Sequence, residues 1–190
     1  MDISKKKPPF PVSDNLRTYL QNYDRSDSLP IKYEDLTNFQ DSAAIFDSKG
    51  NDTLWEAVRY HPSFQDEIES ALTYIYGLLK TDGNMSVIEH LRVSRIDYCL
   101  FGNSKPFRIR IINSLNDNHD YFYIKKADAS RVYGLELEHI LSPNRLAFIV
   151  DENTLIEEHI PGIPGDAFLD YYIETPNFLK SYAAKEFVKF

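Results

Sequence analysis

The sequence contains a single cysteine, Cys99, among its 190 residues. One chain therefore cannot form an internal disulfide, and we expect a reducing compartment such as the cytoplasm. No uncharged apolar stretch approaches the roughly 18 residues that a membrane-spanning helix requires. Near the N-terminus, Lys5, Lys6 and Lys7 precede a proline-rich stretch rather than the apolar run of a signal peptide. These absences predict a soluble cytoplasmic protein.

The sequence also lacks the motifs of several common enzyme classes. Its five histidines show no His-Glu-x-x-His spacing or comparable metal-ligand pattern, so no metal site is predicted. The Gly-x-Ser-x-Gly turn of a serine hydrolase is missing. Cys99 lies in a predicted strand with no identifiable base, which favours a buried side chain over a nucleophile.

Positive charge is scarce as well, since the formal net charge is -8. This balance argues against non-specific binding to nucleic acid and against adhesion to anionic membranes, so we expect neither as a partner. Apolar residues make up 43% of the chain, with thirteen Tyr and twelve Phe. That composition is sufficient for a folded hydrophobic core and is unlike that of a disordered chain.

The first half of the chain reads as an arm followed by helices. Residues 1–12 are rich in Lys and Pro and predict a flexible arm. Ser13 is a suitable N-cap for a helix that begins at Asp14 and ends near Tyr23. The stretch from Tyr33 to Phe46 fits either a short helix or a loop.

Two further helix starts are predicted within the same half. Thr53 and Glu56 match a capping box, in which the side chain of each residue accepts a hydrogen bond from the backbone N–H of the other. Ser63 opens a longer helix with an apolar stripe, and Gly83 lies just past its end. We therefore predict a helical N-terminal extension over residues 13–90.

The pattern changes beyond residue 90, where short apolar-alternating segments separated by turns predict strands. The expected order is strand, strand, strand, helix, strand, strand, over residues 93–101, 107–112, 121–125, 130–141, 145–150 and 154–160. This order predicts an α+β fold, with a five-stranded antiparallel sheet and one packed helix.

The order of elements resembles the small lobe of the protein-kinase-like fold. In that lobe a strand lysine holds the ATP phosphates and pairs with a helix glutamate. The segment from Tyr121 to Lys126 resembles the lysine strand, so the resemblance implies Lys125 as the phosphate-binding lysine, with Lys126 as the alternative. It implies Glu136 as the helix glutamate, with Glu138 as the alternative.

The segment from Asn153 to Gly165 is similar to the hinge of aminoglycoside phosphotransferases and choline kinases, with apolar residues, Glu and then Pro-Gly. This resemblance implies a nucleotide site in which each hinge residue has a role. Ile156 would lie near the gatekeeper position, the backbones of Glu158 and Ile160 at the adenine edge, His159 at an often-aromatic position, and Asp166 near the ribose. The small lobe would span residues 91–165, and residues 166–190 would form the hinge exit and begin a large-lobe helix.

Three features depart from the kinase-like pattern. The turn between the first two strands has only Gly102 in place of a Gly-x-Gly-x-x-Gly run, with Asn103, Ser104 and Lys105 as polar neighbours. Strand alternation puts Tyr123 on the same face as Lys125, where a small residue is usual. After the hinge there is no His-x-Asp followed by Asn and no Asp-Phe-Gly, so no catalytic residue is assigned.

Two functions follow from this comparison. The first is an ATP-binding lobe of a kinase-like phosphotransferase, with Mg²⁺ implied by the resemblance and with a large lobe as a further contact. The second is a degenerate kinase-like module that binds a partner protein without nucleotide turnover. Lys125 and Glu136 favour the first, whereas Gly102 and Tyr123 favour the second. Under either function we expect this chain alone to be inactive in phosphoryl transfer.

Overall fold

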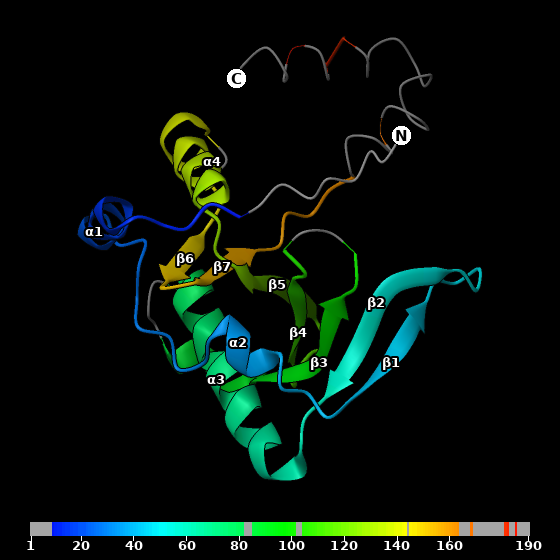
Figure 1. Ribbon diagram of the computed structural model, residues 1–190. Helices are drawn as coiled ribbons and strands as arrows, with labels where there is room; N and C mark the ends of the chain where they lie inside the picture. Colours follow the sequence, from blue (N-terminus) through cyan, green and yellow to red (C-terminus); the bar gives the residue numbers. More distant parts are fainter. Residues whose placement is uncertain are drawn as a thin grey trace, which may run out of the picture.

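The computed structural model describes residues 9–81, 85–101, 104–143, 145–163, 168, 181–182 and 185. Within these ranges the strands form one seven-stranded sheet in the order β1-β2-β3-β4-β5-β7-β6 (Figure 1). Every neighbouring pair of strands is antiparallel. The predicted α+β class with an antiparallel sheet is confirmed, but the predicted number of five strands is wrong.

The elements beyond residue 90 follow the predicted order, and the additional strands lie before it. The strands are β1 (Asp41–Phe46), β2 (Asp52–Arg59), β3 (Leu91–Cys99), β4 (Phe107–Asn113), β5 (His119–Lys126), β6 (Phe148–Asp151) and β7 (Thr154–Glu158). The helices are α1 (Asp14–Asn22), α2 (Tyr33–Leu36), α3 (Pro62–Thr81), the 3₁₀ helix η1 (Met85–His90) and α4 (Ala129–Leu141). Within the described ranges, none of these helices is both long enough and apolar enough to cross a membrane.

The predicted helix at Thr53 and Glu56 is wrong, because both residues lie in strand β2. The Thr53 hydroxyl donates to the carbonyl of Ile45 on β1 at 2.6 Å instead of capping a helix. Asp47 closes the turn between the strands by accepting from the backbone N–H groups of Lys49 and Asn51, both at 2.8 Å. The β1–β2 hairpin extends the sheet as a ribbon (Figure 1). The region predicted as a helical extension therefore also supplies two strands.

One face of the sheet packs on α3 and forms the larger core. Alternate residues of β4 and β5, such as Phe107, Ile109 and Phe122, are fully buried there. Leu72 and Ile75 of α3 pack against them at helical spacing. Residue 29 to residue 36, which includes α2, closes the same core.

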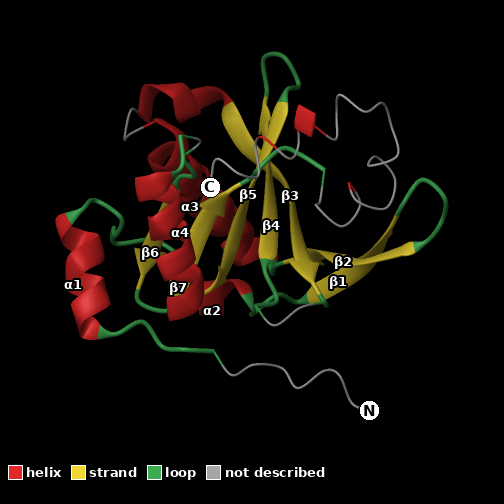
Figure 2. Ribbon diagram, turned by 90° about the horizontal axis from the view of Figure 1, so that it is seen from above, coloured by secondary structure: helices red, strands yellow, loops and turns green. Residues whose placement is uncertain are grey.

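The opposite face is covered at its β6–β7 end by α4 and α1 (Figures 1 and 2). Val132 of α4 and Leu20 of α1 pack with Leu155 of β7 in this second core. The side-chain oxygen of Ser13 accepts from the N–H of Leu16 at 3.3 Å, which confirms the predicted start of α1.

The described end of the predicted arm lies against the N-terminus of α4. The N–H of Phe10 donates to Asp128 Oδ2 at 2.8 Å, and the N–H of Ala129 donates back to the Phe10 carbonyl at 2.8 Å. Val12 is buried in the second core. These contacts fix residues 10–12 in place, and residues 1–8 lie outside the described part of the chain.

Candidate functional site

The sheet face that carries Lys125 gathers charged and aromatic side chains from successive strands. The register puts Asp97 opposite Arg108, Arg108 opposite Tyr123, and Tyr123 opposite Glu157, so these four form a row across β3, β4, β5 and β7. Directly opposite residues have Cβ atoms roughly 4.5–5.5 Å apart, and a favourable pair contributes roughly 0.2–1 kcal/mol. We call this surface the site face, and it consists of Trp55, Arg95, Asp97, Arg108, Arg110, Tyr121, Tyr123, Lys125 and Glu157.

Glu157 is the charged centre of one half of the site face. Only 3% of it is exposed. It accepts from Lys125 Nζ at 2.8 Å, and Arg131 of α4 donates through Nε and Nη2 at 2.7 and 2.8 Å. Burial raises the pKa of Glu157, but the hydrogen bonds from Arg131 and the charge of Lys125 outweigh burial and hold the pKa below its usual value. Glu157 is therefore ionised at neutral pH and orients both cations.

The predicted pair of Lys125 and Glu136 is not formed. Glu136 lies on the side of α4 that packs on α1, where its Oε1 accepts from the hydroxyl of Tyr19 at 2.9 Å. Its other oxygen is 3.6 Å from Nε of Arg25. Helical spacing alone does not show which neighbour a buried helix glutamate faces. Glu157, which sequence reasoning missed, takes the place of Glu136 beside Lys125.

The alternative residues lie elsewhere. Lys126 is exposed and points to the α3 side of the sheet, because it follows Lys125 by one residue in β5. Glu138 is partly exposed on α4. Of the two lysines, Lys125 is therefore the one on the face that α4 covers.

The residues of the predicted hinge divide between the two faces of the sheet. Ile156 is fully buried in the α3 core, so it does not lie beside Lys125 as a gatekeeper residue would. Glu158 accepts from Lys80 Nζ at 2.6 Å and from the N–H of Ala147 at 2.7 Å. His159 Nδ1 is 3.2 Å from the hydroxyl of Tyr123. Ile160 is 64% exposed.

Parts of the resemblance lie outside the described residues. Asp166, predicted near the ribose, is among them, as are Gly102 and Asn103 of the turn between β3 and β4. Most of the segment 166–190 is outside as well. The site is therefore built from the residues up to Ile163.

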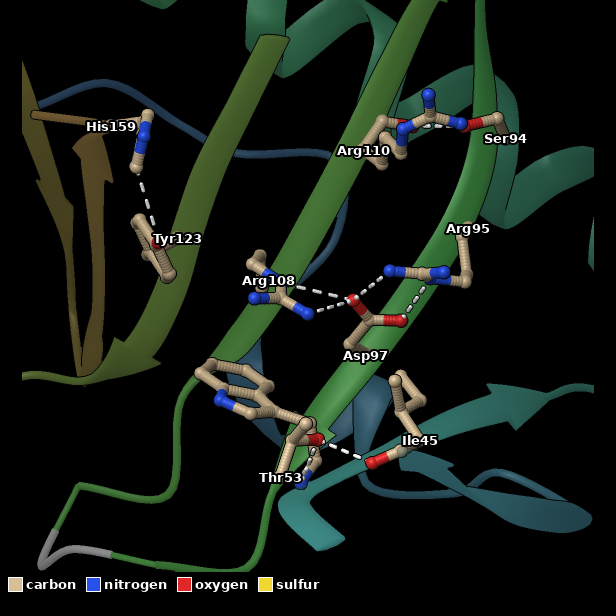
Figure 3. A network of polar contacts seen from close by, with 10 residues as sticks. Ile45, Thr53, Ser94, Arg95, Asp97, Arg108, Arg110, Tyr123 and His159 are labelled. Atoms are coloured by element: carbon tan, nitrogen blue, oxygen red, sulfur yellow. Dashed lines mark hydrogen bonds and ion pairs between the residues drawn. The ribbon is translucent and has the colours of Figure 1, made fainter. Parts of the chain in front are cut away.

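Aromatic rings line the site face between the charges (Figure 3). The guanidinium of Arg108 lies 4.4 Å from the ring centroid of Trp55 and 5.5 Å from that of Tyr121. The ring of Tyr123 is 6.5 Å from Trp55, and Lys125 Nζ lies 5.9 Å from it. Tyr123 therefore shares the face of Lys125, as strand alternation predicts, and its ring occupies space above the sheet.

Cys99 is buried at the end of β3. Its thiol donates to the carbonyl of Phe101 at 3.0 Å. This position agrees with the prediction of a buried side chain.

No family model, curated protein or solved structure matches this chain.

A separate polar contact joins α4 to Arg25, which follows α1 in the chain. His139 of α4 contacts Arg25 through its Nε2. Burial, together with the charges of Arg25 and Arg145, lowers the pKa of His139 below its usual value of 6.5, although Glu136 acts in the other direction.

We expect His139→Gln to flatten the acid side of the stability profile. As the pH falls through 6.5 the unfolded chain takes up a proton before the folded protein does, so stability falls with pH; solvent screening of this partly exposed side chain keeps the slope well below the about 1.4 kcal/mol per pH unit that a whole proton would give. Urea unfolding at pH values between about 7 and 5 measures this slope. His90→Gln, at an exposed position of η1, is the matched control and keeps the wild-type slope. Equal slopes in wild type and His139→Gln would contradict the assignment.

Proposed function

We propose that the protein binds ATP on the site face, as the nucleotide-binding lobe of a kinase-like phosphotransferase. The observation that carries this proposal is the cluster of Lys125, Glu157 and Arg131 beside the rings of Tyr123 and His159. Two cations oriented by one buried carboxylate suit a phosphate chain, and neighbouring rings suit a base. The arrangement occurs in a chain whose net charge is -8, so it is a local concentration of positive charge.

In this proposal Lys125 and Arg131 contact the phosphates. Arg131 is the more accessible cation, since half of its side chain is exposed whereas only 16% of Lys125 is. Glu136 acts indirectly, because its contact with Tyr19 fixes α4 on α1 and so positions Arg131. Glu157 replaces Glu136 as the carboxylate that orients Lys125.

The adenine contacts the segment after β7, where His159 lies beside Tyr123. The N–H of Glu158 already donates to the carbonyl of Ala147 at 3.1 Å. The adenine edge is therefore held by the Glu158 carbonyl and the Ile160 backbone. The contact of Asp166 with the ribose remains part of the proposal, although Asp166 lies outside the described residues. The ring of Tyr123 stacks on the base and takes the place of the small residue that the resemblance implies.

The described residues do not fit a metal site beside Lys125. Both oxygens of Glu157 already accept from Lys125 or Arg131. Within the described ranges, His, Cys, Asp and Glu side chains form no group of three that suits a metal ion. Mg²⁺ would accompany ATP as its counterion, and no step of the proposal depends on it. The proposal covers binding, in a reducing cytoplasm, and assigns no catalytic residue.

We expect Mg-ATP to raise the melting temperature of the wild-type protein and Lys125→Ala to lose more than half of that rise. At about 100 times Kd a ligand adds about 2.7 kcal/mol of stability, which is a rise of roughly 5–10 °C for a protein of this size. Each shift is measured against the ligand-free melting temperature of the same variant, because Lys125→Ala also disturbs Glu157.

Lys126→Ala is the matched control, since it removes the adjacent lysine from the opposite face of the same strand. It keeps the full ATP shift. No shift in the wild-type protein at millimolar ATP, or equal losses in the two lysine variants, would sink the proposal.

The second candidate function is a kinase-like module that binds a partner protein and no nucleotide. The specific observation in its favour is that Glu157 and the ring of Tyr123 already occupy the surroundings of Lys125. A row of exposed apolar residues on the outer side of α4 adds to it, namely Tyr133, Leu137, Ile140 and Leu141. Absence of an ATP shift would favour this function, with a partner protein or a large lobe covering the row.

A further inference from the structure

Two arginines, Arg95 and Arg108, bond one buried carboxylate on the β3–β4 half of the site face, and a third, Arg110, lies beside them. Asp97 has no exposed surface. Arg95 donates to it through Nε at 2.6 Å and Nη2 at 3.1 Å, and Arg108 donates through Nε at 3.0 Å and Nη2 at 2.7 Å (Figure 3). Four N–H groups on one carboxylate fix the planes of both guanidinium groups.

The charges of this cluster do not balance. Arg110 lies directly opposite Arg95 in the register of β3 and β4, and its Nη1 donates to the hydroxyl of Ser94 at 3.3 Å. Like charges directly opposite on a sheet destabilise it. Among the described residues, three arginines and one aspartate leave two positive charges uncompensated, and the next acid along the row, Glu157, is already bonded to Lys125 and Arg131.

The cluster is rigid and reachable from solvent. The guanidinium of Arg108 also lies over the rings of Trp55 and Tyr121, in addition to its bonds to Asp97. The side chains of Arg95 and Arg108 are 41% and 23% exposed. A guanidinium group that is already oriented loses little freedom when it binds the oxygens of a phosphate.

We infer that Arg95, Arg108 and Arg110 form a binding site for a phosphate group, separate from the pair of Lys125 and Arg131. Two uncompensated positive charges match a phosphate, which carries about -1.5 to -2 at neutral pH as a monoester. The group belongs either to a small inorganic phosphate or to a larger phosphorylated ligand. The inference does not depend on the proposed binding of ATP.

The test is the thermal shift of the protein with inorganic pyrophosphate, against NaCl at the same ionic strength. We expect pyrophosphate to stabilise the wild-type protein and Arg110→Gln to weaken its apparent affinity by about tenfold or more, as loss of a charged hydrogen bond does. Arg110 does not contact Asp97 among the hydrogen bonds of the described residues, so Arg110→Gln keeps the buried carboxylate paired. Without an anion, its melting temperature equals or exceeds that of wild type because the repulsion with Arg95 is gone.

Lys126→Gln removes one positive charge from the opposite face and keeps the wild-type affinity for pyrophosphate. Lys125→Ala is compared in the same assay because it removes a cation of the proposed ATP site, and Arg110→Gln is expected to lose more affinity for pyrophosphate than Lys125→Ala does. To distinguish a phosphorylated ligand from inorganic phosphate, the Arg110→Gln comparison is repeated with ATP. If Arg110→Gln loses affinity for ATP and Lys125→Ala does not, the ATP phosphates bind at this cluster.

Two outcomes would overturn the inference. One is a pyrophosphate shift that NaCl reproduces or that Arg110→Gln retains in full. The other is a shift lost in Lys125→Ala and retained in Arg110→Gln, since the phosphate would then bind beside Glu157. If Arg110→Gln does not fold, the Nε–H NMR signals of Arg95 and Arg108 in the wild-type protein decide. The chemical shifts of these signals change on titration with pyrophosphate if the inference holds, and remain unchanged if it is wrong.

Discussion

Phe107→Ala is expected to lower the free energy of unfolding by about 3–5 kcal/mol. Phe107 has no exposed surface and lies where β4 meets α3 and the segment of α2. Its ring centroid is 5.6 Å from that of Tyr33 and 4.8 Å from that of Tyr98. Truncation leaves a cavity that the rigid sheet cannot close, so the loss exceeds the transfer energy of the ring alone. Urea unfolding measures the difference.

Phe101→Ala is the matched control, because Phe101 is 71% exposed in the turn after β3. Its effect stays within about 0.5 kcal/mol. A loss below about 1 kcal/mol for Phe107→Ala would be incompatible with the packing of the sheet on α3.

Glu157→Gln is expected to lower the free energy of unfolding by about 2–4 kcal/mol at neutral pH. Removing one partner of a buried ion pair costs about 3–5 kcal/mol, and the exposure of Arg131 reduces this figure. The effect depends on pH because the pKa of Glu157 is depressed in the folded protein. The stabilisation is present above the usual carboxyl pKa of 4.5 and is lost as the pH falls through the folded value. The difference between wild type and Glu157→Gln therefore shrinks in acid.

Glu152→Gln serves as the control for Glu157→Gln. Glu152 is exposed in the turn between β6 and β7, and its replacement changes stability by less than about 0.5 kcal/mol. Urea unfolding at neutral and acidic pH gives both quantities. Equal stability of wild type and Glu157→Gln would mean that Lys125 and Arg131 do not depend on this carboxylate.

The second half of the fold was predictable because one face of each strand is buried. Alternation of Phe107, Ile109 and Ile111 with polar residues identified β4, and the same rule put Tyr123 on the face of Lys125. The first half of the fold was less predictable from the sequence. Thr53 and Glu56 fit a capping box and also the alternation of a strand, and the turn around Gly50 was the signal for the hairpin.

The candidate site was predictable only where it depends on local pattern. Lys125 follows an apolar run in β5, which identified it as the lysine of interest. The ion-pair partner of Lys125 is Glu157, and this pairing depends on the register between β5 and β7. That register sets Glu157 opposite Tyr123, two residues before Lys125 on the same face. The local sequence pattern does not distinguish Glu157 from Glu158, although their side chains point to opposite faces of the sheet. The arginine cluster is equally non-local, because Arg95 and Arg108 meet only when β3 pairs with β4.

The hairpin that sequence patterns did not reveal supplies the chain's only tryptophan, Trp55, to the site face. Its indole lies against Arg108 of the arginine cluster, and its ring centroid is 6.5 Å from that of Tyr123. Intrinsic tryptophan emission therefore arises from one place in this molecule, and that place borders both proposed phosphate sites. Excitation at the red edge of the tryptophan absorption band selects Trp55 over the thirteen tyrosines. The fluorescence of Trp55 therefore reports ligand binding on the site face without a label.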